Sequence, residues 1–163
     1  LKTLPGTLLD VADYRHVPKG PGIMLITHEI SFAMDHGEGH FGLFAQRKRG
    51  QATTHQGALL ELLQATITFA GQLEADLRVA GQLSLEAGAF EYQSNDRLLL
   101  PNTPEAFNTV EADLAAVGNI LYPNHTVTVT RVDNDSRDRL TVRIDSGASL
   151  EIASLLEAIG AVA

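Results

Sequence analysis

Runs of alternating apolar and polar residues recur along the chain, and short polar turns interrupt them. The turns fall near Gly37-Glu38, Ser94-Asn95-Asp96 and Asn134-Asp135-Ser136. A stretch with the three- and four-residue apolar spacing of a helix follows each turn. The order strand, turn, strand, helix thus occurs three times in the pattern, which predicts three successive ββα units.

The first predicted unit spans residues 23–77. Residues 23–35 alternate as one strand, residues 41–48 return beside it, and a helix follows with Thr53 or Thr54 as its N-cap. The expected buried stripe of this helix consists of Leu59, Leu62, Leu63, Thr66, Phe69, Ala70, Leu73 and Leu77.

A turn centred on Gly37-Glu38 sets the register of this first hairpin. Phe32 is then expected opposite Leu43, and His28 on the core face opposite Arg47. A histidine in that position is either a hydrogen-bonded residue of the core edge or a neutral base or ligand.

The second predicted unit spans residues 78–123. Its strand positions are Leu83, Leu85, Phe90, Tyr92, Leu98 and Leu100. Thr103 suits the N-cap of the following helix, Pro104 its first position, and Pro123 ends it. The expected buried positions of that helix are Phe107, Val110, Leu114, Val117 and Leu121.

The third predicted unit spans residues 124–163, with strands over 126–132 and 140–144. Ser146 or Ser149 is expected to cap a last helix. Its apolar stripe consists of Ile152, Leu155, Leu156, Ile159 and Val162.

Together these units predict an α+β fold and a single domain, residues 1–163. About six mainly antiparallel strands form one sheet with three helices on one face. Residues 1–22 are expected to be an irregular arm, because prolines and glycines interrupt them. The opposite sheet face stays uncovered and is available to a second subunit or a ligand. That face holds Glu29, Ser31, Phe44, Glu86 and Glu91.

Composition narrows the possible functions. The chain has no cysteine, which excludes disulfides, cysteine zinc sites, iron–sulfur clusters and thiol nucleophiles. The net charge of -8 disfavours nucleic acids and anionic membranes as partners. No apolar run is long enough to span a bilayer. A cytoplasmic location is the default expectation.

The first hairpin is rich in possible metal ligands: Asp35, His36, Glu38 and His40. Imidazole and carboxylate groups suit a divalent metal such as Zn²⁺, Fe²⁺, Mn²⁺ or Ni²⁺. His28 lies about 23 Å from Asp35 along an extended strand, so it joins this site only if the chain folds back or a second subunit contributes it. The alternative is a solvated glycine-rich turn in which Asp35 and His40 form a cross-strand pair.

A basic run is the second candidate site. Arg47, Lys48 and Arg49 end a strand, and Thr54 and His55 stand at the following helix start. Free N–H groups at a helix start attract anions, so these residues are candidates for holding a phosphate or carboxylate ligand. No Walker loop or dinucleotide fingerprint is present. The alternative is a solvated strand end.

No GxSxG elbow or HExxH motif occurs in the chain, and no spacing selects a catalytic triad. The first expectation is therefore a small, non-catalytic binding or interaction protein that forms homo-oligomers. The alternatives are a metal-binding protein or metalloenzyme that uses the first hairpin, and a binder of small anionic ligands that uses the basic run.

Overall fold

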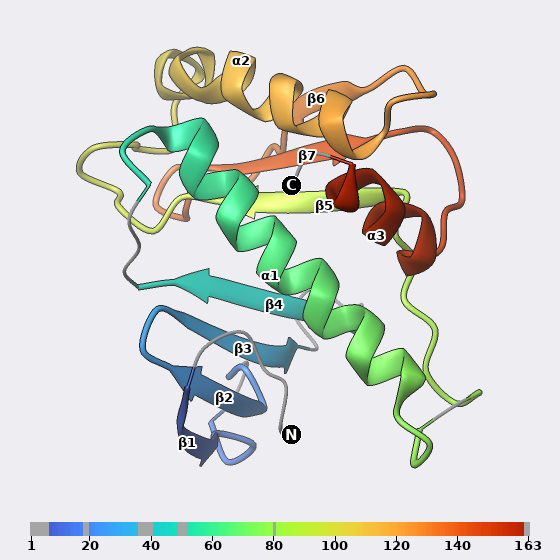
Figure 1. The fold of residues 1–163 in the computed structure, drawn as a ribbon. Coiled ribbons are helices and arrows are strands. Elements are labelled where there is room, and N and C mark those ends of the chain that lie inside the picture. The colour runs from blue at the N-terminus through green and yellow to red at the C-terminus, as the bar shows by residue number, and fades with distance from the viewer. Residues whose placement is uncertain (1–6, 18–19, 36–40, 49–51, 80, 162–163) are drawn as a thin grey trace. The chain divides into compact units, whose positions relative to one another are not determined.

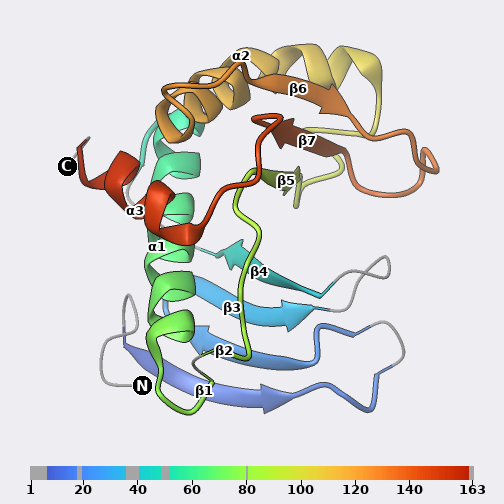
Figure 2. The same cartoon turned by 90° about the vertical axis from the view of Figure 1, so that its right-hand side faces the viewer.

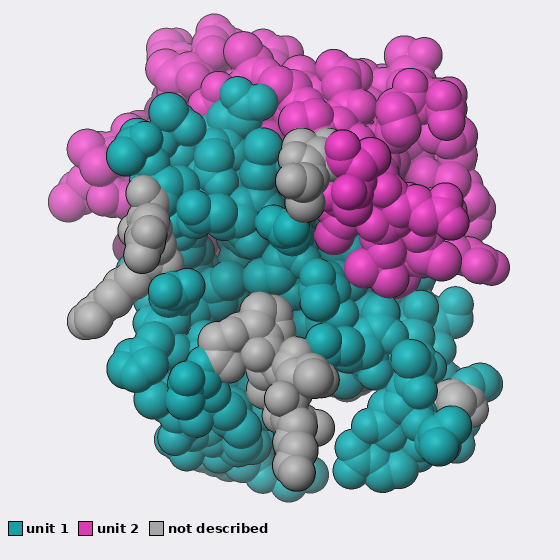
Figure 3. All heavy atoms as spheres, in the orientation of Figure 1, with its two compact units in different colours: residues 1–85 teal, residues 86–163 magenta. Residues whose placement is uncertain are grey.

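A computed structural model of the chain describes residues 7–17, 20–35, 41–48, 52–79 and 81–161. Within these residues it contains three helices and two antiparallel sheets, of four and three strands, so the α+β class is confirmed (Figure 1 and Figure 2). The expected single sheet of about six strands is instead two sheets. The chain divides into two compact units, residues 1–85 and 86–163 (Figure 3). The single-domain organisation stays a prediction.

The first unit is an antiparallel meander covered by one long helix. Its strands are β1 (Leu8–Asp13), β2 (Ile23–Thr27), β3 (Ile30–Asp35) and β4 (Gly42–Arg47), and each pairs with the next. Helix α1 (His55–Ala75) follows. The core between sheet and helix contains Ile30, Phe32 and Phe69, with Leu25, Leu43, Ala45, Leu62, Ala65 and Leu73 around them. The Phe32 and Phe69 ring centroids lie 4.8 Å apart.

The predicted strand over residues 23–35 is two strands in the structure. The buried Thr27 hydroxyl donates to the carbonyl oxygen of Ile30 at 2.7 Å and accepts from its N–H at 3.2 Å. These two bonds close a tight turn at residues 28–29, so β2 and β3 fold back on each other. His28 is therefore an exposed turn residue and not a core-face residue opposite Arg47.

The β3–β4 register differs from the expected register by two residues. Phe32 pairs with Ala45 rather than Leu43, and the last pair is Asp35 with Gly42. Because side chains alternate with a period of two, the even shift keeps the side chains of β3 and β4 on their predicted faces. The predicted turn at Gly37-Glu38 lies outside the described residues.

The arm predicted over residues 1–22 contains a strand. β1 pairs with β2. Val11 lies opposite Leu25, and Leu25 in turn lies opposite the core residue Phe32. Pro5 and Pro18 lie outside β1 in the sequence. No residue of the strand itself is therefore a proline, and each keeps the backbone N–H that strand pairing uses. A register irregularity near Asp10 and a 2.8 Å bond from the Val11 N–H to the Asp10 carboxylate mark this edge strand. Such features discourage pairing with another strand.

The second unit packs two helices with a three-stranded sheet. Its elements are β5 (Ala89–Gln93), α2 (Pro104–Leu121), β6 (Thr128–Arg131), β7 (Thr141–Asp145) and α3 (Ile152–Gly160). The strand order is β5-β7-β6, and α2 packs against β6, β7 and α3. The most deeply buried apolar side chains of this unit include Val110, Leu114, Val117, Leu121, Leu140, Val142 and Ile144.

The predicted second hairpin does not form. The Asp96 carboxylate accepts the N–H groups of Leu98 at 2.9 Å and Leu99 at 3.0 Å, and the Leu100 N–H donates to the Asp96 carbonyl at 2.9 Å. These bonds hold residues 96–100 in a turn, so no strand returns beside β5. β5 pairs with β7 instead, and residues 83–85 precede it without strand structure. The repeat of three ββα units is therefore incomplete.

The first two helix starts are as predicted. The Thr54 hydroxyl accepts the Gly57 N–H at 3.1 Å, and the Thr103 hydroxyl accepts the Ala106 N–H at 3.2 Å. Each threonine satisfies one backbone donor that the first helical turn leaves unpaired.

The start of α3 differs from the prediction. Its N-cap is Glu151, whose side chain makes no capping bond. The Ser146 hydroxyl donates to the Gly88 carbonyl at 2.8 Å, and the Ser149 hydroxyl donates to the Glu86 carboxylate at 2.8 Å. Both serines thus tie the loop before α3 to the segment before β5.

Three loops contain the same local ion pair, in the sequence Asp-x-Arg. In each, the aspartate accepts the backbone N–H and the side-chain N–H groups of the arginine two residues later. The pairs are Asp13–Arg15, Asp76–Arg78 and Asp135–Arg137. Because ionised carboxylates accept these bonds best, the pKa of each aspartate lies below its usual value.

We expect Gly88→Ala to destabilise the second unit. A Cβ at this position would lie 1.8 Å from the Ala148 carbonyl oxygen, and this backbone contact cannot be relieved by a side-chain rotation. The expected loss in the free energy of unfolding is about 3 kcal/mol, measured by urea denaturation. Gly160→Ala is the control, because nothing lies within 4 Å of its added Cβ. Equal stability of the two variants would contradict this packing.

We expect the Asp13 carboxyl to titrate at about pH 2 in the folded protein. The Arg15 side chain and backbone N–H groups lower the pKa of Asp13 from 3.8 to about 2. The pair therefore stabilises the fold fully above pH 3.8, and this contribution is lost as the pH falls through about 2. Carboxyl ¹³C shifts would report the midpoint, which Arg15→Ala should return towards 3.8. A wild-type midpoint already near 3.8 would refute the pairing in solution.

Candidate interaction site

The candidate metal ligands fall at two separate places. Asp35 is the last residue of β3, whereas the exposed His28 lies in the turn before that strand. A six-residue strand separates them by about 20 Å. His36, Glu38 and His40 lie outside the described residues. Among the residues that the structure does describe, no three His, Asp or Glu side chains are grouped to hold a metal ion. The metal site at the hairpin tip stays a prediction.

The basic run contacts groups of its own unit. The Arg47 guanidinium donates to the Glu61 carboxylate of α1 at 2.7 Å and so links β4 to the helix. The Lys48 ammonium donates to the Thr27 carbonyl oxygen at the end of β2. An anion at this place would have to compete with both carbonyl and carboxylate acceptors.

The other anion candidates lie at or near the start of α1. The Thr54 hydroxyl is the N-cap acceptor, and His55 is the first helical residue. Arg49 lies outside the described residues. The anion site therefore stays a prediction.

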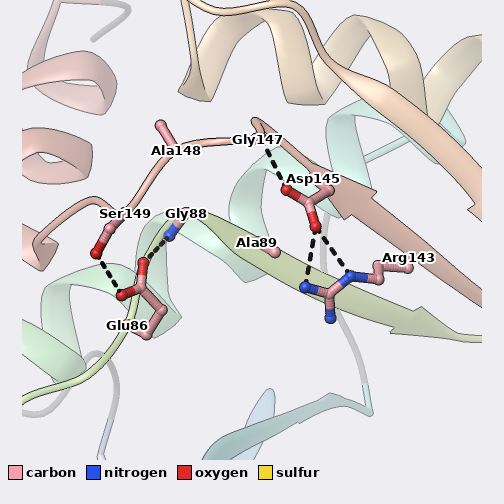
Figure 4. A pocket seen from close by; sticks show the side chains of 8 residues that line it. All are labelled: Glu86, Gly88, Ala89, Arg143, Asp145, Gly147, Ala148 and Ser149. Carbon is pink, nitrogen blue, oxygen red and sulfur yellow. Dashed lines mark hydrogen bonds and ion pairs between the residues drawn. The ribbon is translucent and has the colours of Figure 1, made fainter.

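An open depression of about 350 Å³ lies on the second unit (Figure 4). Residues of the segments 86–89 and 143–149 line it. Figure 4 shows Glu86 and Asp145 on either side of this depression, with Arg143 beside Asp145.

Both carboxylates of the depression are engaged by internal donors. Glu86 accepts the N–H groups of Leu150 and Gly88, each at 3.0 Å, and the Ser149 hydroxyl. The Leu150 N–H, then the Ser149 hydroxyl, lowers the pKa of Glu86.

Asp145 accepts the Gly147 N–H at 2.7 Å and two N–H groups of Arg143. These donors lower its pKa, the Gly147 N–H having the larger effect. The internal donors that Glu86 and Asp145 accept hold the segments 86–89 and 143–149 in place around the depression.

Sequence reasoning missed the most exposed apolar residues of the second unit. Leu98 is 94% exposed and Leu99 is 79% exposed. The Asp96 turn projects them, and their apolar character was interpreted as a returning strand. The sequence held a signal against that strand, because three consecutive leucines, Leu98 to Leu100, lack the apolar–polar alternation of an antiparallel strand with one solvated face.

A second loop supports this turn. The Arg97 guanidinium donates to the Arg137 carbonyl at 2.7 Å. The buried Asn102 amide donates to the Asn134 side chain at 2.6 Å and accepts from the Arg131 guanidinium at 2.8 Å. We name residues 94–102 the leucine loop and residues 131–139 the arginine loop; these bonds hold the two together.

Comparison with known proteins gives no functional assignment. No protein-family model, curated protein or solved structure matches the chain. Within the described residues, no helix has the length and apolarity needed to cross a bilayer. The function must therefore be argued from the geometry of the chain itself.

We expect Asp96→Ala to loosen the leucine loop. Loss of the carboxylate leaves the Leu98 and Leu99 N–H groups without their acceptor, so their amide hydrogen exchange should accelerate about tenfold. Asp133→Ala is the matched control, since Asp133 is an exposed carboxylate in the arginine loop. Unchanged exchange in Asp96→Ala would show that the turn does not depend on this side chain.

Proposed function

We propose that this chain is a non-catalytic interaction protein that self-associates and uses the leucine loop as a contact surface. The observation that supports it is the presentation of Leu98 and Leu99, largely exposed, on a turn closed by hydrogen bonds. Single exposed apolar residues are common on protein surfaces. Two adjacent leucines on a hydrogen-bonded turn are a stronger indication of a binding surface.

The energetics of association favour such a surface. Burying a leucine side chain gains roughly 1.5–3 kcal/mol. The turn is already hydrogen-bonded in the free chain, so a partner need not order it, and less of that gain is lost on binding. In the folded chain Leu98 gains almost nothing from burial, because 94% of its surface remains exposed.

The chemistry of the described residues gives less support to the alternatives. The carboxylates of the depression accept internal hydrogen bonds, and no metal-binding trio occurs among the described side chains. A phosphate at the basic run would have to draw Arg47 away from Glu61. Anion binding at the basic run ranks behind protein contact. The first hairpin stays an alternative metal site, because His36, Glu38 and His40 lie outside the described residues.

We expect the wild-type chain to sediment as a species heavier than its 17.5 kDa monomer at high concentration. Replacing both leucines, in Leu98→Ser/Leu99→Ser, should return it to the monomer, because the contact loses its apolar centre. Both side chains are exposed, so the thermal midpoint should stay unchanged.

Leu77→Ser is the matched control for that experiment. Leu77 is 93% exposed but lies in the first unit, so its loss should leave association intact. A wild type that remains a monomer at every concentration reached would refute self-association. Equal weakening by Leu77→Ser would refute a specific role for the leucine loop.

A further inference from the structure

We propose that the leucine loop binds the exposed side of α3 in a second copy of the chain. This rests on the proposed self-association and names the two surfaces that meet. Three observations support it: the charge distribution of the second unit, the exposed face of α3, and the placement of both surfaces at opposite ends of one sheet.

Charge is unevenly distributed over the second unit. All of its arginines except Arg143 lie in the leucine and arginine loops. The same loops hold as many aspartates, so their formal charge balances. Neither α2 nor α3 contains a lysine, arginine or histidine, while α2 alone carries three carboxylates. Two acidic copies therefore repel least where the loops of one approach the other.

Two arginines of the loops have no described carboxylate partner, although Arg97 donates one N–H to the Arg137 carbonyl oxygen. Arg97 and Arg139 form no ion pair with any residue that the structure describes, whereas Arg137 is paired with Asp135. Arg97 immediately precedes Leu98. The contact surface thus combines an apolar centre with guanidinium groups, which suits a partner surface that has an apolar centre and carboxylates around it.

The exposed side of α3 has that composition. Leu156 is 37% exposed there, Glu157 is next to it, and Glu151 stands at the N-cap. Ala153 and Gly160 are exposed one turn before and one turn after Leu156. These small residues leave room beside Leu156 for incoming leucine side chains, and nothing lies within 4 Å of a Cβ built at Gly160.

The topology separates the two surfaces within one chain. Gln93 pairs with Thr141 and Ala89 with Asp145, so the leucine loop leaves β5 beside the start of β7. α3 follows the other end of β7. Figure 1 and Figure 2 show the two surfaces at opposite ends of this sheet. A contact between unlike surfaces of identical chains builds rings or open chains.

The test is a charge exchange between the two surfaces. The loop variant is Arg97→Glu/Arg139→Glu, and the helix variant is Glu151→Lys/Glu157→Lys. Each variant alone sets like charges against each other and should self-associate at least about tenfold more weakly than the wild type. In an equimolar mixture every loop meets an α3 of opposite charge. Sedimentation should then show association restored to within about threefold of the wild type.

Two further measurements test the same contact independently of the charge exchange. Leu156→Ser should weaken wild-type association as Leu98→Ser does, even where a charge variant fails to fold. Wild-type association should also weaken as salt concentration rises, because exposed charges are screened.

The outcomes separate this inference from the function on which it rests. A mixture that stays monomeric, from two folded variants, would overturn α3 as the binding surface. Self-association through the leucine loop would then still stand if Leu98→Ser/Leu99→Ser abolishes it. An associated wild type indifferent to Leu156→Ser would also overturn the inference. A monomeric wild type would overturn both.

Discussion

Hydrogen bonds from short polar side chains to nearby backbone groups decide where the strands of this protein stop. The Thr27 hydroxyl closes the turn between β2 and β3, and the Asp96 carboxylate closes the turn after β5. Each offers the backbone a local partner that competes with a strand partner. The Thr27 bonds add the β2–β3 hairpin to the first sheet. The Asp96 bonds prevent residues 98–100 from returning as a strand beside β5.

The Asp96 bond also links fold to function. Had residues 98–100 returned as a strand beside β5, alternate leucines would have faced a core. The turn instead presents Leu98 and Leu99 to solvent, while Asn102 joins the turn to the arginine loop. A surface of this kind depends on backbone geometry that is already formed before any partner arrives. That geometry is the observation on which the proposed protein contact rests.

The electrostatics of the second unit favour weak and adjustable association. Its carboxylates outnumber its arginines, and the arginines gather near the leucine loop. The acidic surface makes two copies repel each other. The repulsion is weakest at the leucine and arginine loops, where arginines and aspartates are equal in number. In the proposed contact, the apolar residues contribute affinity and the charges contribute orientation.

Helix positions and the faces of β3 and β4 could be predicted from the sequence because they depend on local interactions. The face of β2 could not, because the turn at residues 28–29 places Leu25 in the row of Phe32. Thr54 and Thr103 cap helices through residues three positions away, and Val110 and Leu114 share one helical face by spacing alone. The even register shift in the first hairpin left the predicted faces correct for the same reason. The separation of His28 from Asp35 along β3 follows in the same way from strand length, which is a local property.

Strand partners and the contacts of the candidate sites were decided only by tertiary structure. β5 and β7 are separated in the chain by α2 and β6, and no local signal joins them. Arg47 meets Glu61 only because α1 folds back on β4, so the basic run could not be recognised as internally paired. Sequence by itself therefore determined the helices and the apolar faces of β3 and β4, but not β1, the turn between β2 and β3, or the absence of a strand after β5. Folding determined which elements meet, because pairing reflects competition among all available partners, and it thereby determined that Leu98 and Leu99 remain exposed.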